Sequence, residues 1–266
     1  MTDDQQRHGM QKATFMIAQL KHKWKTSRLR FAMASYQKPS RKPEALQEAV
    51  AAVRKCARDE DWRSWTSLPY QDDLVQFLVD NRQAGSGVIE VGCFRGGLSV
   101  QLAAICKHYR WPFYTIDVDE SSVKNTSRQL KRLNLGSHSV VFQGSLQQFV
   151  ARTSLHQRPV AIIIDGDHHY DAVRKDIQSV YQLNHLPYAA AFHDFSLRHP
   201  TTGERVDDAI HASFGDEVRV RKIGRQFNNQ GDYPTELSPG PDGHYWETPG
   251  SEGAIVQLPP ALPLRR

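Results

Sequence analysis

A regular alternation of short apolar segments and helical segments between residues 88 and 193 constrains the fold most strongly. The apolar segments predict strands over 88–92, 113–117, 139–143, 160–165 and 188–193. Helical patterns cover 97–108, 121–134, 145–154 and 170–184. Strands of such continuous apolar character are buried on both faces, which is typical of parallel sheets. The alternation therefore predicts an α/β fold in which helices cover both faces of a mostly parallel sheet.

The last part of the chain departs from this alternation. After a helix near 204–213, we expect a strand over 217–224 and another over 254–259. Two late strands joined by a long connection predict an antiparallel addition at one edge of the sheet. The connection, 225–253, is interpreted as a long loop of a domain that spans 84–260. It is either a lid that stacks on a flat or sugar-like substrate, or a disordered or packing loop. Its aromatic and imidazole residues are Tyr233, His244, Tyr245 and Trp246.

Positive charge is concentrated at the N-terminal end. Residues 1–43 hold ten Lys or Arg against Asp3 and Asp4, a net charge of +8, which leaves −3 for the rest of the +5 chain. The body is therefore not a nucleic-acid-binding surface. Apolar residues recur at helical spacing within 10–35, which predicts a basic amphipathic extension. It either docks on the body or a second copy, as we favour, or lies on an anionic membrane surface.

The chain shows neither a secretory signal nor an apolar run of the roughly 18 residues that a membrane span needs. We therefore expect a cytoplasmic protein, at most peripheral at the inner membrane face. Residues 44–83 form a helical lead-in to the domain, and they begin with an apolar helical face at Leu46, Val50 and Val53.

A glycine-rich turn follows the first predicted strand, with Gly92, Gly96 and Gly97 in an unusual spacing. In dinucleotide-binding proteins a glycine lets the backbone approach a pyrophosphate, but Phe94 stands at that position here. Glu90, near the end of the strand, favours a ligand with positive charge or an amino group. S-adenosylmethionine (SAM), which carries a sulfonium and an α-amino group, meets that electrostatic demand.

Two further turns contribute to the same predicted site. Asp117 ends the second strand, where a carboxylate can bind both ribose hydroxyls of an adenosine; Asp119 is expected to cap the next helix. Gly144 and Ser145 end the third strand and leave room for adenine, and Ser145 also has the character of a helix N-cap.

The most specific signal is "IIIDGDHHYDAVRKDI", in which Asp165 ends the fourth strand and His168 follows. The fifth strand ends in His193 and Asp194. The ends of neighbouring parallel strands lie side by side, so we expect Asp165 and Asp194 to meet. Two close carboxylates repel unless they share a proton or a cation, and Mg²⁺ is the natural oxygen-liganded ion.

Together, "IEVGCFRGGLS", "TIDVD", "IIIDGDHHYDAVRKDI" and "FHDF" resemble class I SAM-dependent methyltransferases. Within that class they are most similar to the macrocin-type sugar O-methyltransferases and the cephalosporin-hydroxylase-like proteins. The resemblance covers roughly residues 70 to 223. It implies a Rossmann-like seven-stranded sheet with an antiparallel last strand, SAM as the methyl donor and, in many members, a bound Mg²⁺.

The resemblance also implies roles for individual residues. Asp165 would bind the metal and lie beside the cofactor, Asp194 would be a second metal ligand, and His168 would be the general base. His193 departs from the acidic pair usual after the fifth strand, so a metal here would be one that accepts imidazole. The residues expected to bind SAM are Glu90, Gly92, Phe94, Gly96, Ser99, Asp117, Ser145 and Asp165.

The leading hypothesis is thus a metal-assisted O-methyltransferase that acts on a hydroxyl of a small molecule or glycan. The alternatives are a methyltransferase acting on nitrogen and a SAM-binding partner protein without catalysis. A NAD-dependent oxidoreductase is disfavoured because Phe94 fills the glycine position. The presence of Asp165, His168 and Asp194 together argues for an enzyme, since a protein that only binds SAM needs no general base.

Overall fold

The computed structural model describes residues 44–62, 64–199, 201, 205–229 and 244–263. The predicted extension over 1–43 and the centre of the predicted 225–253 loop, including Tyr233, lie outside the described residues. None of the described helices is long and apolar enough to cross a bilayer.

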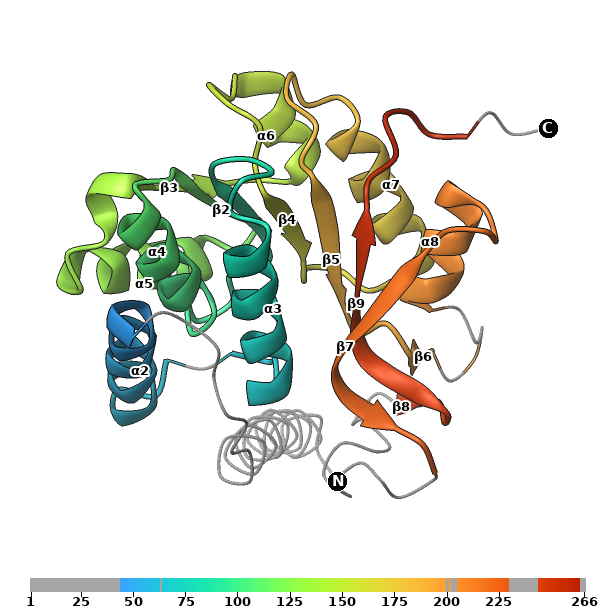
Figure 1. Cartoon of the computed structure of the whole chain (residues 1–266), viewed down its shortest axis with the longest axis horizontal. Coiled ribbons are helices and arrows are strands. Elements are labelled where there is room, and N and C mark those ends of the chain that lie inside the picture. Colours follow the sequence, from blue (N-terminus) through green and yellow to red (C-terminus); the bar gives the residue numbers. More distant parts are fainter. Residues whose placement is uncertain (1–43, 63, 200, 202–204, 230–243, 264–266) are drawn as a thin grey trace, which may run out of the picture.

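Seven strands form one sheet in the order β3-β2-β1-β4-β5-β9-β7, which confirms the predicted fold class (Figure 1). The first five strands pair in parallel, and β9 is antiparallel to both of its neighbours. Their bounds are β1 Val88–Val91, β2 Phe113–Asp117, β3 Ser139–Gln143, β4 Ala161–Ile164, β5 Ala189–His193, β7 Val220–Phe227 and β9 Gly250–Gln257.

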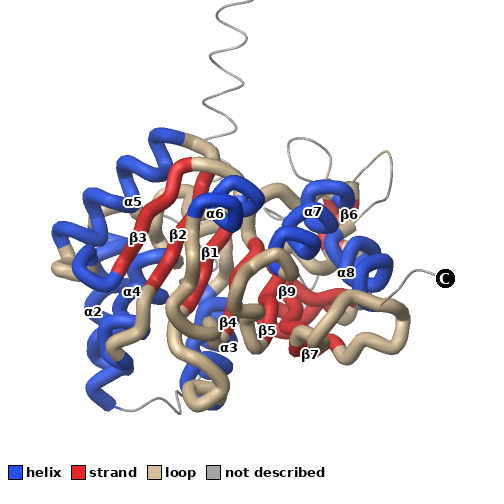
Figure 2. Tube along the Cα trace, turned by 90° about the horizontal axis from the view of Figure 1, so that it is seen from above, coloured by secondary structure: helices blue, strands red, loops and turns tan. Residues whose placement is uncertain are grey.

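Helices cover both faces of this sheet (Figure 2). On one face lie α3 Leu68–Asp80, α4 Ser99–Tyr109 and α5 Glu120–Arg132, and α2 Glu44–Asp59 packs on α4. The other face packs against α6 Leu146–Arg152, α7 Tyr170–Val180 and α8 Val206–Phe214. A short 3-10 helix, Gly136–His138, leads into β3. The predicted helices and parallel strands agree with these elements to within a few residues.

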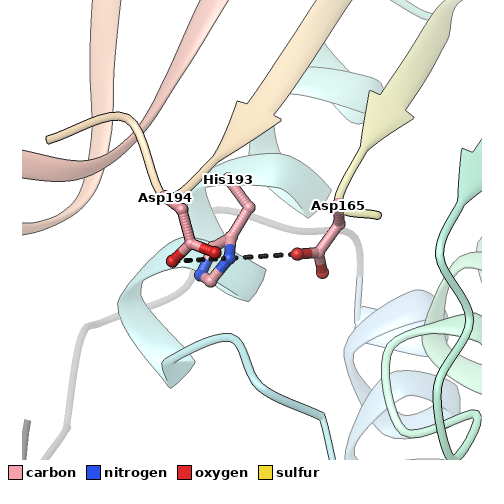
Figure 3. Close-up of side chains that lie close together, drawn as sticks. All are labelled: Asp165, His193 and Asp194. Carbon is pink, nitrogen blue, oxygen red and sulfur yellow. Dashed lines mark ion pairs between the residues drawn. The ribbon is translucent and has the colours of Figure 1, made fainter. Parts of the chain in front are cut away.

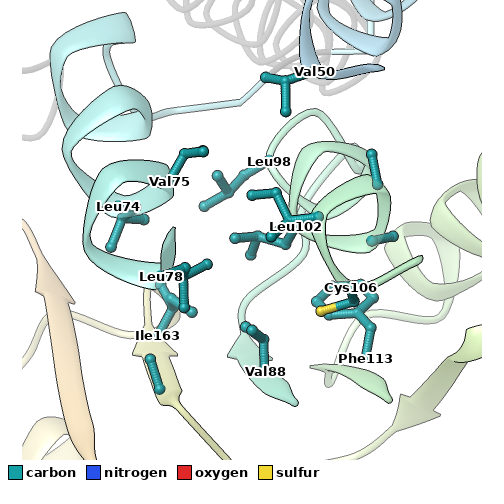
Figure 4. Close-up of a cluster of buried hydrophobic side chains, with 14 of the residues drawn as sticks. Val50, Leu74, Val75, Leu78, Val88, Leu98, Leu102, Cys106, Phe113 and Ile163 are labelled. Carbon is teal, nitrogen blue, oxygen red and sulfur yellow. The ribbon is translucent and has the colours of Figure 1, made fainter. Parts of the chain in front are cut away.

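Alternation along each buried strand divides the core in two. Val88 and Ile163 face the α2–α4 side, where they meet Leu74, Leu78 and other apolar side chains (Figure 4). Their neighbours Ile89 and Ile164 face the α6–α8 side. Because successive strand side chains point to opposite faces, a fully buried parallel strand must be apolar at nearly every position. The one charged residue inside β1, Glu90, therefore stands out.

The late strands differ from the prediction. β7 runs to Phe227 and β9 begins at Gly250, so both extend into the segment that was interpreted as a loop. That segment also carries β8, Tyr245–Trp246, which pairs with β6, Leu197–Arg198, in a small second sheet. Trp246 is buried against Leu197 and Phe227. Trp246 is therefore a packing residue, as the second interpretation of this segment expected.

Candidate functional site

A cleft of about 1200 Å³ opens where β1, β2, β3 and β4 end. Gly92, Asp117, Gly144 and Asp165, each at or directly after one of these strand ends, all line it. The carboxyl ends of parallel strands are the usual ligand site of such sheets, because the crossover connections leave a crevice there. The four predicted turns therefore converge on one cavity.

The glycine turn after β1 is tightly constrained. Gly92 has φ +92°, and a Cβ there would lie within 3.0 Å of the Asp165 backbone, so no other residue fits without a shift. Phe94 also has a positive φ, +49°, which is strained for an aromatic residue. Phe94 thus adopts the left-handed backbone that a glycine would supply, and its ring meets Trp65 edge to face at 5.5 Å.

Asp117 holds this turn in place. Its Oδ2 accepts hydrogen bonds from the backbone N–H groups of Cys93 (2.9 Å) and Phe94 (3.0 Å), and its Oδ1 accepts from the N–H of Asp119 (2.9 Å). The carboxylate lines the cleft at the same time. It joins the ends of β1 and β2 in the position where a ribose was predicted to lie.

Glu90 is fully buried and does not line the cleft. Its Oε2 accepts hydrogen bonds from the hydroxyls of Ser99 and Thr115, both at 2.6 Å, whereas Oε1 has no hydrogen-bond partner among the described residues. Burial raises the pKa of Glu90 to about 8, although the two hydroxyls lower it. Glu90 and Ser99 therefore lie behind the glycine turn rather than in the open cleft.

Two predicted helix caps are confirmed. The Asp119 side chain accepts from the N–H of Ser122 at the start of α5, and Ser145 forms a capping box with Gln148 at the start of α6. Ser145 also lines the cleft, so its two predicted roles are compatible. Sequence reasoning missed Val118, a cleft residue that is 72% exposed. An apolar residue directly after Asp117, the end of the predicted second strand, was the available signal.

Next to the cleft residue Asp165, the His193 ring lies between Asp165 and Asp194 (Figure 3). Its Nδ1 lies 3.0 Å from Asp165 Oδ1 and 3.2 Å from Asp194 Oδ1. Neither contact has hydrogen-bond geometry, so Nδ1 is buried without a hydrogen-bond partner among the described residues. Burial raises the pKa of Asp165, with partial compensation from His193. Burial would lower the pKa of His193, but the two carboxylates outweigh it and raise that pKa well above its usual value.

These three residues fit a divalent cation. Suitable ligand atoms of Asp165, His193 and Asp194 all lie within 4.8 Å of one another. In an octahedral site with ligands about 2.1 Å from the ion, neighbouring ligand atoms are about 3 Å apart, close to the two distances at Nδ1. The orphaned nitrogen between two carboxylate oxygens is the observation that supports the fit.

His168 lies beside this cluster. Its Nδ1 is 3.8 Å from Asp194 Oδ2, and its Nε2 is buried with no hydrogen-bond partner among the described residues. The His244 ring approaches it edge to face at 4.9 Å. His168, the residue predicted as general base, thus lies adjacent to Asp194.

Comparison with known proteins agrees with this geometry. Residues 89–195 match a family model described as a methyltransferase domain; they run from the second residue of β1 past the end of β5 and include the strand ends that form the site. Over these residues the chain is similar to methyltransferase domains. No curated protein matches the chain.

Solved structures with TM-scores of 0.50 or more share this fold. A putative O-methyltransferase from Klebsiella pneumoniae has a TM-score of 0.53 at 12% identity, with 90% of this chain and 99% of that chain covered. The O-methyltransferase TomG from Streptomyces achromogenes, in complex with SAM, has a TM-score of 0.50 at 12% identity, with 90% and 98% covered. An SAH-bound methyltransferase from Podospora anserina has a TM-score of 0.42 at 14% identity. That match covers 57% of this chain and 62%, less than two thirds, of that chain.

Proposed function

We propose that this protein is a SAM-dependent O-methyltransferase that acts on a hydroxyl group with the help of a divalent cation. The observation that carries the proposal is the placement of Asp165. It lines the large cleft together with the glycine turn, and it also contacts the His193–Asp194 cluster. A donor cofactor in the cleft and an acceptor at the cluster would therefore meet at Asp165.

The residues of the cleft suit SAM in this orientation. The Gly92–Gly96 turn would hold the methionine end, Asp117 would bind the ribose hydroxyls, and Val118 and Ser145 would lie beside the adenine. The structure of TomG in complex with SAM supports the choice of cofactor, as does the methyltransferase model. Glu90 would lie behind this turn and would influence the bound SAM without lining the open cleft.

The chemistry follows from the cluster. As the acceptor oxygen attacks the methyl carbon, the bond from that carbon to sulfur breaks, S-adenosylhomocysteine leaves, and the hydroxyl proton must be removed. The buried Nε2 of His168 is the proposed acceptor of that proton. A cation bound by Asp165, Asp194 and His193 would lower the pKa of the hydroxyl. The acceptor is proposed to be a small molecule or a glycan.

Calorimetric titration with SAM tests this proposal. Micromolar binding that is lost in Asp117→Ala, with no heat from NAD, is the expected result, because Asp117 both shapes the turn and faces the ligand. A separate heat with Mg²⁺ should disappear in Asp165→Ala. His168→Gln should retain SAM binding while methyl transfer to a hydroxyl acceptor falls by roughly 10²–10⁴-fold. An absence of SAM binding would refute the proposal, and SAM binding without transfer to any acceptor would favour a partner protein.

The N-terminal extension is proposed to bring the domain to its partner, either a second copy or an anionic membrane that holds a glycolipid acceptor. This rests on the charge of residues 1–43 and the apolar spacing within 10–35. Co-sedimentation of the full chain with anionic vesicles, compared with a variant that begins near residue 44, tests membrane contact. Equal binding of the two would eliminate that role.

A further inference from the structure

The buried carboxylate of Glu252, which sequence reasoning did not consider, contacts the far side of the His193 ring. Glu252 lies on β9, next to β5, and is 4% exposed. Its Oε1 is 3.3 Å from His193 Nε2, while Nδ1 on the opposite side of the ring faces Asp165 and Asp194. His193 is thus held between Glu252 and the proposed cation site.

Glu252 can only accept in this arrangement. The backbone N–H of Ser67 donates to its Oε1 at 2.6 Å, the N–H of Arg225 donates to its Oε2 at 3.1 Å, and the Ser67 hydroxyl also donates to Oε2. Because both carboxylate oxygens accept, the His193 Nε2 must carry the hydrogen.

With a hydrogen on Nε2, Nδ1 is the nitrogen that faces the two aspartates and would give its lone pair to a bound cation in place of a proton. In metalloproteins a carboxylate that accepts from one nitrogen of a ligating histidine fixes its tautomer and raises its basicity. We propose that Glu252 is such a positioning residue, and that the site therefore binds a divalent transition ion that accepts imidazole, such as Mn²⁺, Fe²⁺ or Co²⁺, in preference to Mg²⁺. This inference rests on the cation site of the proposed function.

The donor set supports this choice of ion. Mg²⁺ prefers oxygen ligands, whereas imidazole suits borderline transition ions. An all-carboxylate site would need no ring with a fixed tautomer. Here one of the three converging residues is a histidine whose side chain is only 5% exposed and whose ring packs edge to face against Tyr70 at 5.0 Å. The ring has little freedom to turn away, so an ion bound to both aspartates would meet Nδ1.

The test uses full-length, metal-free protein and compares the affinities for Mg²⁺ and Co²⁺ by calorimetry. Any oxygen-rich site binds Co²⁺ more tightly than Mg²⁺, so the informative quantity is the change in their ratio on mutation. We expect His193→Asn to lower the Co²⁺ preference at least tenfold. Glu252→Gln should weaken Co²⁺ binding by roughly 10–100-fold while Mg²⁺ affinity stays within about threefold. Asp73→Asn is the matched control, because Asp73 accepts from Gly224 at the same α3–β7 junction.

A direct reading of ligation keeps the inference testable if a buried variant fails to fold. Pulsed electron paramagnetic resonance of Mn²⁺ bound to protein labelled with ¹⁵N-histidine should show a coupled histidine nitrogen. An unchanged ratio in His193→Asn, or Mn²⁺ without that coupling, would overturn the inference. So would a protein that binds no divalent ion, because His193 would then hold a proton in place of the metal. SAM binding, measured separately, decides the proposed function independently.

Discussion

At the scale of single residues, Glu90 is a buried acid, and its burial disfavours the ionised form of its carboxyl group. Its pKa in the folded protein is about 8, above the usual 4.5 of a glutamate, because burial outweighs the Ser99 and Thr115 hydrogen bonds. A raised carboxyl pKa favours the native state at low pH, and that contribution is lost as the pH rises from about 4.5 to about 8.

Glu90→Gln, which mimics the neutral acid, should therefore become progressively more stable than the wild type as the pH rises through that window. The linkage slope is at most about 1.4 kcal/mol per pH unit for one group. Urea unfolding of both proteins between pH 5 and 8.5 measures the difference. Glu48→Gln, at an exposed position on α2, is the control for loss of a carboxylate. A constant difference across this range would show that Glu90 is charged in the native protein at every pH.

At the scale of elements, α6 illustrates a helix whose start was predictable from a few residues. Ser145 accepts from the N–H of Gln148 at 3.2 Å, and Gln148 Oε1 accepts from the N–H of Ser145 at 3.0 Å. Ser145→Ala removes one half of this capping box and should lower the free energy of unfolding by about 1 kcal/mol.

Ser145→Asp distinguishes the capping role of Ser145 from its proposed role in cofactor binding, because aspartate caps helices as well as serine does. We expect it to restore most of the stability that Ser145→Ala loses, while adding a negative charge to the cleft where adenine is proposed to lie. Chemical denaturation measures the first effect and SAM titration the second. Equal stability of Ser145→Ala and the wild type would contradict the capping role.

The late strands show why local sequence is insufficient for some elements. β1 and β4 were predicted within a residue or two because four successive buried residues leave few alternatives. β9 begins with Gly250, Ser251 and Glu252, a composition typical of loops, and becomes a strand because β5 and β7 bond to it from both sides. At Gly253 a Cβ would lie within 3.0 Å of Tyr70 and of the Phe192 carbonyl. Tertiary contacts, not propensity, specify this strand.

The same reason explains which parts of the site could be predicted. His193 ends β5, and Asp165, His168 and Asp194 follow strands in the sequence, so that parallel pairing brings their positions together. Glu252 lies on a strand with weak local signal and reaches His193 only through the antiparallel β5–β9 pairing. The contact between Asp117 and the glycine turn likewise depends on where β1 and β2 end relative to each other.

At the scale of the whole molecule, the proposed cofactor site joins the turns after four strands, so ligand binding should stabilise the domain as a unit. A ligand that binds only the native state at 100 times its Kd adds about 2.7 kcal/mol to the free energy of unfolding. For a domain of this size each kcal/mol raises Tm by about 2–4 °C. Saturating S-adenosylhomocysteine should therefore raise Tm by roughly 5–10 °C in a thermal unfolding experiment. Asp117→Ala should abolish that rise, since it loosens the turn as well as the ribose contact, and NAD should produce none. An equal shift with NAD would mean that the cleft accepts a dinucleotide despite Phe94, and the choice of SAM would then be wrong.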